Sequence, residues 1–223
     1  MRVLLLGQRF CIYRRTLTLP SPGLPGEGKT ATHRLVALIV FLCAGCSATI
    51  IPPPVPDDAV TIALTDYGRH ASVVFPDRDG TGSVEYTFGD WDWFAAGHNG
   101  PTDAVQAMLW SKGSTLGRRH VDLKPDSPEL IHELLADRII LLHVPRDRAA
   151  GLRDALGKRF ELHANQALYN QVMELHFIPD AENYGLFHNC NHVTARWLSE
   201  MGCGIRGNPV TSKFKLAPAP AAH

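Results

Sequence analysis

The chain has 223 residues, enough for one good hydrophobic core in addition to a short targeting segment. Its 22 Lys and Arg residues balance 22 Asp and Glu residues, so the formal net charge at pH 7 is +0. No basic stripe runs along the chain, and nucleic acid is therefore not an expected partner. Hydrophobic residues make up 45%, as in an ordinary globular protein.

The N-terminal region has the pattern of a secretory signal peptide. Lys29 and Arg34 precede an apolar run, residues 35–45, that is too short to span a bilayer. Residues 1–28 precede this pattern as an extension rich in turn-forming residues. We therefore expect residues 1–46 to be an N-terminal extension plus a signal peptide, separate from the folded domain.

The end of this segment resembles a bacterial lipobox, in which small residues precede a cysteine that is lipidated and becomes the mature N-terminus. Ala44 and Gly45 precede Cys46 here. The resemblance implies lipid attachment at Cys46. Because Ser47 follows, rather than the aspartate of inner-membrane lipoproteins, it also implies an outer-membrane location facing the periplasm. A cleaved signal peptide without lipid is the alternative.

The residues after Cys46 divide into three segments by composition. Pro52–Pro56 predicts a stiff, extended tether between the anchor and the domain. The expected segments are a Pro-rich tether at residues 47–58, one folded domain at 59–208 and a disordered tail at 209–223.

The first half of the domain predicts three strands and then two helices. The strands are expected at residues 60–64, 72–75 and 84–88, joined as an antiparallel meander. The helices are expected at residues 101–112, with a proline in the first position, and at 127–136.

The second half predicts one strand followed by helices. A continuous apolar run at residues 138–144 indicates a buried strand, and residues 146–158 are amphipathic with helical spacing. Residues 167–177 are also expected to be helical. The order of elements predicts an α+β fold, an antiparallel sheet packed on helices.

Cys190 carries the strongest indication of chemistry in the chain. Apolar residues recur after it with helical spacing, at Val193, Trp197, Leu198 and Met201. Asn189 is a good N-cap, so Cys190 would be the first residue of this helix. A thiol there lies at the positive end of the helix dipole, beside unpaired amides, and both features favour the thiolate.

A disulfide between Cys190 and Cys203 is the structural alternative for this cysteine, because the periplasm permits disulfides. A helix from Cys190 to about Met201 would be roughly 16 Å long at about 1.5 Å per residue. A disulfide needs Cα atoms within about 7 Å of each other. The length of this helix therefore counts against the disulfide.

Three stretches together resemble a known family. Residues 66–76 contain Gly-x-His, an apolar strand and a proline; residues 84–94 contain Glu-aromatic and then Gly-Asp; and Asn189-Cys190-Asn191 begins a helix. These blocks are similar to those of the bacterial domain of unknown function 2459, which looks like a circularly permuted papain-like protein of the NlpC-like kind. The resemblance covers residues 60–204. It departs from the family at Arg69, where an aromatic residue is usual, and at Thr87, where glycine is usual.

The resemblance implies a circularly permuted papain-like (NlpC-like) fold and a Cys/His pair. Cys190 would be the nucleophile, and His70 would accept its proton and later protonate the leaving group. By likeness to papain-like folds, the residue that orients the imidazole lies on the strand after the histidine. That indicates Glu85, with Asp90 as second choice. The first-turn amides near Cys190 are a candidate oxyanion site.

A zinc site formed by Cys190, His188 and His192 is a further alternative. Residues two apart point to different sides of a helix start, and no Cys-x-x-Cys pair lies in the domain that contains them, so no metal or cofactor is expected. Three neighbouring aromatic residues either line a substrate groove or belong to the core: Trp91, Trp93 and Phe94.

Two functions from different classes follow. The first is an envelope lipoprotein with a thiol hydrolase site, an amidase, peptidase or acyltransferase, for which cell-wall peptides are the nearest substrate and acyl lipids the next. The second is a non-catalytic envelope lipoprotein that uses the same fold for binding. In both, the lipid makes the membrane a partner.

Overall fold

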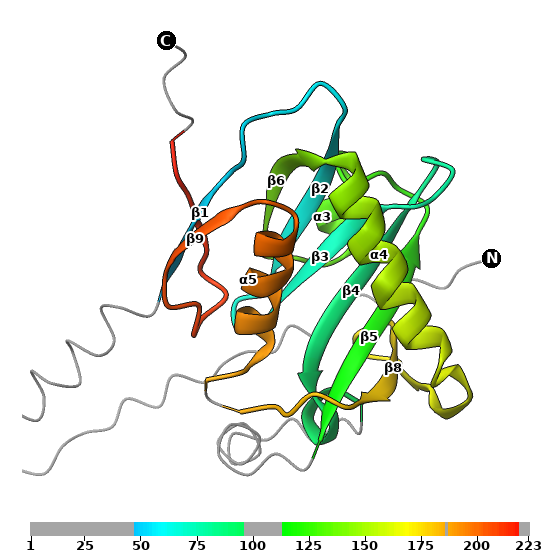
Figure 1. Cartoon of the computed structure of the whole chain (residues 1–223). Helices are drawn as coiled ribbons and strands as arrows, with labels where there is room; N and C mark the ends of the chain where they lie inside the picture. Colours follow the sequence, from blue (N-terminus) through cyan, green and yellow to red (C-terminus); the bar gives the residue numbers. More distant parts are fainter. Residues whose placement is uncertain (1–46, 96–112, 186, 219–223) are drawn as a thin grey trace, which may run out of the picture. The chain divides into compact units, whose positions relative to one another are not determined.

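The computed structural model describes residues 47–95, 113–185 and 187–218, and a seven-stranded sheet lies at its centre (Figure 1). The strand order is β6-β2-β3-β4-β5-β8-β7, and all neighbouring strands are antiparallel. The strands are β2 (Ala59–Asp66), β3 (Ala71–Pro76), β4 (Ser83–Asp90), β5 (Ser114–Val121), β6 (Arg138–Pro145), β7 (Leu168–Asn170) and β8 (Leu175–Asp180). An α+β fold with an antiparallel sheet is thus confirmed.

Strands β2 to β5 are neighbours both in sequence and in the sheet, as the predicted meander requires. Alternate residues point to opposite faces because the side-chain period of a strand is two. One face of the meander is apolar and fully buried, with Leu64, Val73, Phe75, Tyr86 and Phe88 in the main core. The other face carries the polar side chains of Ser72, Glu85 and Thr87, all buried.

Two helices, α4 (Arg146–Glu161) and α5 (Cys190–Glu200), cover the apolar face (Figure 1). Both were predicted, and α5 begins at Cys190 with Asn189 as its N-cap. The Oδ1 atom of Asn189 accepts hydrogen bonds from the amides of Asn191 and His192, at 3.0 and 3.2 Å. This cap fixes where the helix begins and therefore where the Cys190 thiol lies.

On the opposite face, a single turn of helix, α3 (Leu130–Glu133), packs Leu130 against Ala63 and Val74. The predicted helix at residues 127–136 is therefore shorter than expected. Leu135 ends it, because its φ of 54° is left-handed and incompatible with a continuing helix. A π-helical turn, η1 (Trp91–Ala95), follows β4.

A small second sheet corrects two predicted boundaries. Its order is β10-β1-β9, with β1 (Ala48–Ile51) antiparallel to β9 (Gly204–Gly207) and parallel to β10 (Lys215–Leu216). Ile50 is fully buried and Phe214 is 1% exposed. The domain thus begins at Ala48 rather than residue 59, and residues 209–218 are part of it, because these apolar side chains complete the core.

The predicted helix at residues 167–177 is wrong. A 3₁₀ turn, η2 (Ala164–Gln166), leads into a hairpin of β7 and β8. Asn170 makes the turn, since its Oδ1 accepts hydrogen bonds from the amides of Val172 and Met173. Asn side chains that bind nearby backbone amides compete with helix formation. Leu175 and Phe177 then alternate into the core as strand residues.

Strand β6 is found where residues 138–144 predicted a strand, but it is an edge strand and only partly buried. Leu142 and Val144 face the core, whereas Leu141 is 43% exposed. The apolar run therefore reflects an edge strand rather than one covered on both faces.

Several predictions fall on residues that the structure does not describe. These are the signal peptide and Cys46, the helix at residues 101–112 and the last five residues of the tail. Within the described ranges, no helix is long and apolar enough to cross a membrane.

Candidate functional site

A tight turn between β2 and β3 presents His70. The amide of Tyr67 donates to the carbonyl oxygen of His70 at 2.8 Å, and the amide of Gly68 donates to Oδ1 of Asp66 at 2.9 Å. Gly68 has a φ of 83°, and a Cβ there would lie 2.8 Å from Oδ2 of Asp137. The Asp-Tyr-Gly-Arg-His sequence therefore forms this turn because only glycine fits its third position.

The start of α5 brings Cys190 to the same place from the far end of the chain. Its thiol is buried and hydrogen-bonds with the hydroxyl of Tyr184 and with the backbone amides of Asn191 and Ala71. The hydroxyl of Thr194 donates to the carbonyl oxygen of Ala71 at 3.3 Å, which joins α5 to the first residue of β3. The residue after His70 therefore contacts both the thiol and its helix.

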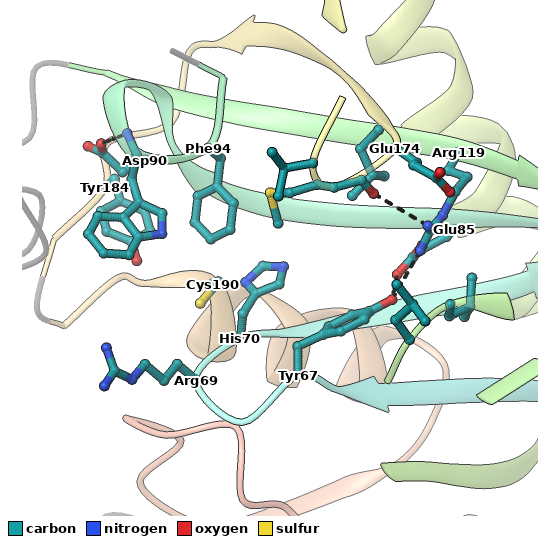
Figure 2. Close-up of a pocket in the computed structure, with 16 residues that line it drawn as sticks. Tyr67, Arg69, His70, Glu85, Asp90, Phe94, Arg119, Glu174, Tyr184 and Cys190 are labelled. Carbon is teal, nitrogen blue, oxygen red and sulfur yellow. Dashed lines mark hydrogen bonds and ion pairs between the residues drawn. The ribbon is translucent and has the colours of Figure 1, made fainter. Parts of the chain in front are cut away.

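Cys190 and His70 line one pocket, and the imidazole lies beside the sulfur (Figure 2). The Nε2 atom of His70 forms a short hydrogen bond with Oγ1 of Thr87. The Nδ1 atom is buried and has no hydrogen-bond partner among the described residues. It is thus the ring nitrogen of His70 that Thr87 does not occupy. The two residues predicted from the sequence are brought together.

Both groups of this pair are held in their neutral forms. Burial raises the pKa of Cys190 to about 11, although the hydrogen bonds from Tyr184 and the backbone amides act in the opposite direction. Burial lowers the pKa of His70 to about 4, and the carboxylates of Glu85 and Asp66 oppose this shift. The expected thiolate is therefore wrong for the resting site, because desolvation outweighs the helix start.

Glu85 does not orient the imidazole, contrary to the prediction; Thr87, two residues along β4, does. Glu85 instead accepts hydrogen bonds from the hydroxyls of Tyr67, at 2.6 Å, and Ser72. It also forms an ion pair with Arg119, whose Nε lies 2.9 Å from Oε2. Glu85 thus stabilises the turn that carries His70.

Asp90, the second choice, stabilises the turn after β4. Its Oδ1 accepts from the amide of Trp93 at 2.9 Å. This turn places the Phe94 ring against His70, with ring centroids 4.6 Å apart and planes tilted by 47°. Trp93 and Phe94 line the pocket, whereas Trp91 only packs against the apolar cluster to which Phe94 belongs. The groove and core interpretations of these aromatic residues therefore both apply.

The amides at the start of α5 are less free than predicted for an oxyanion site. Those of Asn191 and His192 already donate to the Asn189 side chain. The hydroxyl of Tyr184 is the remaining side-chain donor beside the thiol. Tyr184 lies in the loop before α5, and no sequence pattern indicated it.

The pocket has a volume of ≈ 440 Å³, within the range of about 300–1,000 Å³ that is usual for small-molecule sites. Its walls are largely apolar: Trp93, Phe94, Leu134, Leu135, Val172, Met173 and Leu175. Leu135 and Glu174 have φ values of 54° and 55°, and no other non-glycine residue in the described ranges has a positive φ. Both line this pocket, and such backbone strain concentrates at functional sites.

The histidines that flank Cys190 are engaged elsewhere. Nε2 of His188 lies 2.9 Å from Oε2 of Glu182, and Nε2 of His192 lies 3.0 Å from Oδ1 of Asn208. No group of three His, Cys, Asp or Glu side chains in the described part of the chain could hold a metal ion. Cys190 and Cys203 are free thiols, in agreement with the separation expected from the helix.

Comparisons with known proteins add no relative from which a function could be transferred. No family model, no curated protein and no solved structure matches this chain. The chemistry of the site must therefore be argued from the geometry of its own residues.

Proposed function

We propose that this chain is a thiol hydrolase or acyltransferase that acts on an amide or an ester. The observation that carries the proposal is the arrangement of one imidazole: His70 lies beside the Cys190 sulfur, with Nε2 held by Thr87 and with a buried, unpartnered Nδ1. A nucleophile, a base and a residue that orients the base are the parts required for covalent acyl transfer.

In the proposed reaction, Sγ of Cys190 attacks the carbonyl carbon while Nδ1 of His70 accepts the thiol proton. The carbonyl oxygen takes up the electron pair, and the Tyr184 hydroxyl, which bonds the thiol at rest, donates to it. The imidazolium then protonates the leaving nitrogen or oxygen as its bond to carbon breaks. Water or an acceptor alcohol attacks the thioester, and the thiol is released.

Carboxylates near the imidazole assist this proton transfer. Glu85 and Asp66 both favour the protonated form of His70, as their effect on its pKa indicates. Their influence matters most when His70 becomes an imidazolium inside a buried site, because charges interact strongly where water is excluded. The neutral resting pair would thus convert to its charged form only during attack.

The fold proposed for this site is a circularly permuted papain-like one, of the NlpC-like kind. The support is chain order: His70 precedes β3, whereas the Cys190 helix comes late and packs on β3 and β4. The family resembled by the three sequence blocks has the same order. Cell-wall peptides and acyl lipids are the proposed substrates.

The proposed location is the outer membrane, facing the periplasm, with lipid on Cys46. Strand β1 begins at Ala48, the second residue after Cys46. A lipid at that position would therefore hold the domain itself against the bilayer, and the proline segment would not act as a spacer.

A non-catalytic binding protein is the second candidate, and one observation favours it. The pKa of Cys190 is raised and that of His70 is lowered, so both groups are uncharged at rest. A preformed thiolate–imidazolium pair would be the more reactive state. A largely apolar pocket with a neutral thiol would also suit binding alone.

Acylation of Cys190 separates the two candidates. The protein is incubated with p-nitrophenyl decanoate, and the acyl adduct is located by mass spectrometry of the peptides that contain Cys190 and Cys203. The enzyme is expected to form a thioester on Cys190, and His70→Ala is expected to slow it by about 100-fold, the scale of general acid–base catalysis. His143→Ala, at an exposed histidine on β6, is the matched control and should match the wild type.

A missing adduct on Cys190, or one that forms equally fast in His70→Ala, would exclude the hydrolase and favour the binding protein. Adducts on Cys190 and Cys203 in equal amount would show only intrinsic thiol reactivity, and would count against the enzyme in the same way.

A further inference from the structure

We infer that the substrate of this site is an anionic amphiphile, with an apolar acyl chain in the pocket and a negatively charged group held by Arg69. The inference rests on the proposed function for the reaction, but it concerns recognition. It is carried by a free cation and by apolar side chains that line the same pocket as the Cys190–His70 pair (Figure 2).

Arg69 supplies the cationic side. It is exposed, lines the pocket and directly precedes His70 in the turn that presents the imidazole. No hydrogen bond or ion pair joins its guanidinium to another residue in the described ranges. Its backbone is fixed by the Tyr67–His70 hydrogen bond, so its side chain extends from a rigid position beside the nucleophile.

The other guanidinium of the pocket, that of Arg119, is already neutralised. Its Nε and Nη2 atoms donate to Glu85, and Nη2 also lies 3.2 Å from the Tyr67 hydroxyl. The side chain of Arg119 is only 11% exposed. A substrate anion would have to break this buried ion pair to bind there, whereas Arg69 needs no such rearrangement.

Glu174 lies beyond the imidazole from Arg69 in Figure 2, and its neighbours in the chain, Val172 and Met173, also line the pocket. Two apolar side chains of the pocket, Leu135 and Val172, are 81% and 84% exposed. Leu134 and Met173 continue the same surface inward. Large apolar side chains that are this exposed at the rim of a pocket mark a binding surface, and an acyl chain would cover them.

The geometry therefore orients the substrate. The acyl chain runs over Leu135 and Val172, the carbonyl carbon lies at Cys190, and the leaving portion extends toward Arg69. Attack by Sγ forms the S–C bond and breaks the bond to the leaving group, which takes the proton from His70 and departs with its negative charge. Water then cleaves the thioester and releases the fatty acid.

Binding measurements test recognition separately from chemistry. Dissociation constants are measured by calorimetry for N-decanoylglycine, its neutral amide N-decanoylglycinamide, the chainless N-acetylglycine and decyl phosphate. We expect the anion to bind about tenfold more tightly than its neutral amide, the scale of a hydrogen bond to a charged group. N-acetylglycine should bind at least about tenfold more weakly than N-decanoylglycine, because it buries no chain.

Arg69→Gln should bring the two decanoyl ligands within about twofold of each other, since it removes the charge and keeps the length. Arg206→Gln, at an exposed arginine on β9 outside the pocket, is the matched control and should keep the wild-type preference. The dissociation constants of decyl phosphate and N-decanoylglycine are also compared. The ligand that binds more tightly shows whether the site prefers a phosphate or a carboxylate.

Three results would overturn the inference. The wild type could bind the anion and the amide equally, Arg69→Gln could keep the wild-type preference for the anion, or no decanoyl ligand could bind. Hydrolysis of N-decanoylglycine is followed separately in the wild type. A protein that shows the Arg69-dependent preference but no Cys190 thioester would refute the proposed reaction and keep the recognition.

Discussion

Thr87 and His70 share the hydrogen bond on which the candidate site depends, between Oγ1 and Nε2. A hydroxyl at this position can accept a hydrogen bond from Nε2–H, and in that tautomer Nδ1 carries no proton. Thr87 fits there because Gly117 lies opposite it in β5; a Cβ on Gly117 would lie 2.6 Å from the Thr87 methyl group. The threonine and the glycine thus form one unit that holds the Nε2 side of the imidazole in place.

Thr87→Val should therefore weaken acylation of Cys190 while the fold is kept. Valine has almost the same shape but leaves Nε2 without a partner, and a buried unsatisfied group costs about 1–3 kcal/mol. We expect a loss of about tenfold in the acylation rate, measured with p-nitrophenyl decanoate. Thr87→Ser restores the hydroxyl and should recover most of the rate. A serine variant as slow as the valine variant would show that packing, not the hydrogen bond, was lost.

The positions of Cys190 and His70, and the strands and helix that bring them to one pocket, were predictable from the sequence. Helical spacing after Cys190 and the Asn189 cap are local signals, and α5 begins as expected. The alternation in β2, β3 and β4 is local too. Thr87 was missed although β4 offered a signal: it lies two residues after Glu85 and so on the same face of the strand.

The remaining features depend on contacts between distant parts of the chain. Residues 167–177 have apolar spacing compatible with a helix, and only the Asn170 turn and the pairing with β5 select a hairpin. The pKa of Cys190 follows from burial, which a sequence does not reveal. The ion pair of Glu85 with Arg119 likewise requires the β4–β5 register.

The neutral thiol predicts the pH dependence of Cys190 labelling. Because its pKa is raised to about 11, the thiolate fraction should grow steadily as the pH rises from 7 to 10. The rate of alkylation by iodoacetamide should rise over the whole interval, whereas free cysteine levels off above its pKa of about 8.5. The measurement uses the Cys203→Ala background, since that thiol also has a raised pKa. A plateau below pH 8 would indicate a preformed thiolate and contradict the assignment.

His70 predicts a loss of stability in acid. Its folded-state pKa of about 4 lies below the value of about 6.5 expected in the unfolded chain. Above pH 6.5 both states are neutral and there is no effect. Between pH 6.5 and 4 the unfolded state binds a proton that the folded state does not, so the free energy of unfolding falls as the pH falls.

His70→Gln should remove roughly 3 kcal/mol of this acid-dependent loss between pH 7 and pH 4, as measured by urea unfolding at each pH. The interval from pH 7 to pH 8 is an internal control, because His70 is neutral there in both states. An identical acid slope in the wild type and His70→Gln would show that the imidazole is not buried in its neutral form.

The ion pair of Glu85 and Arg119 predicts a large effect on stability. Glu85→Gln leaves a guanidinium that is only 11% exposed without its charge partner. Loss of one partner of a buried pair costs about 3–5 kcal/mol, a fall in Tm of roughly 10 °C for a domain of this size. Glu161→Gln is the matched control: its pair with Arg118 has a carboxylate that is 62% exposed, so the change should be within about 1 kcal/mol. Similar melting temperatures for both variants would refute a structural role for Glu85.

The last prediction compares Gly89 with Gly151. Substitution by alanine should change the free energy of unfolding in opposite directions at these two positions. A Cβ on Gly89 would lie 2.2 Å from Cδ2 of Phe94, the ring that packs on His70. Gly89→Ala must therefore move Phe94, and overpacking of this kind costs about 1–3 kcal/mol. Because Phe94 supports the imidazole, acylation of Cys190 should slow as well.

Gly151 lies in α4, where a Cβ would meet nothing within 4 Å. Gly151→Ala should raise the free energy of unfolding by about 0.5–1 kcal/mol, because alanine loses less backbone freedom in a helix. It should leave acylation unchanged. Urea unfolding and the acylation rate are measured on both variants. If Gly89→Ala acylates Cys190 at the wild-type rate, Phe94 does not help to position His70. Thr87 would then be the residue that positions it.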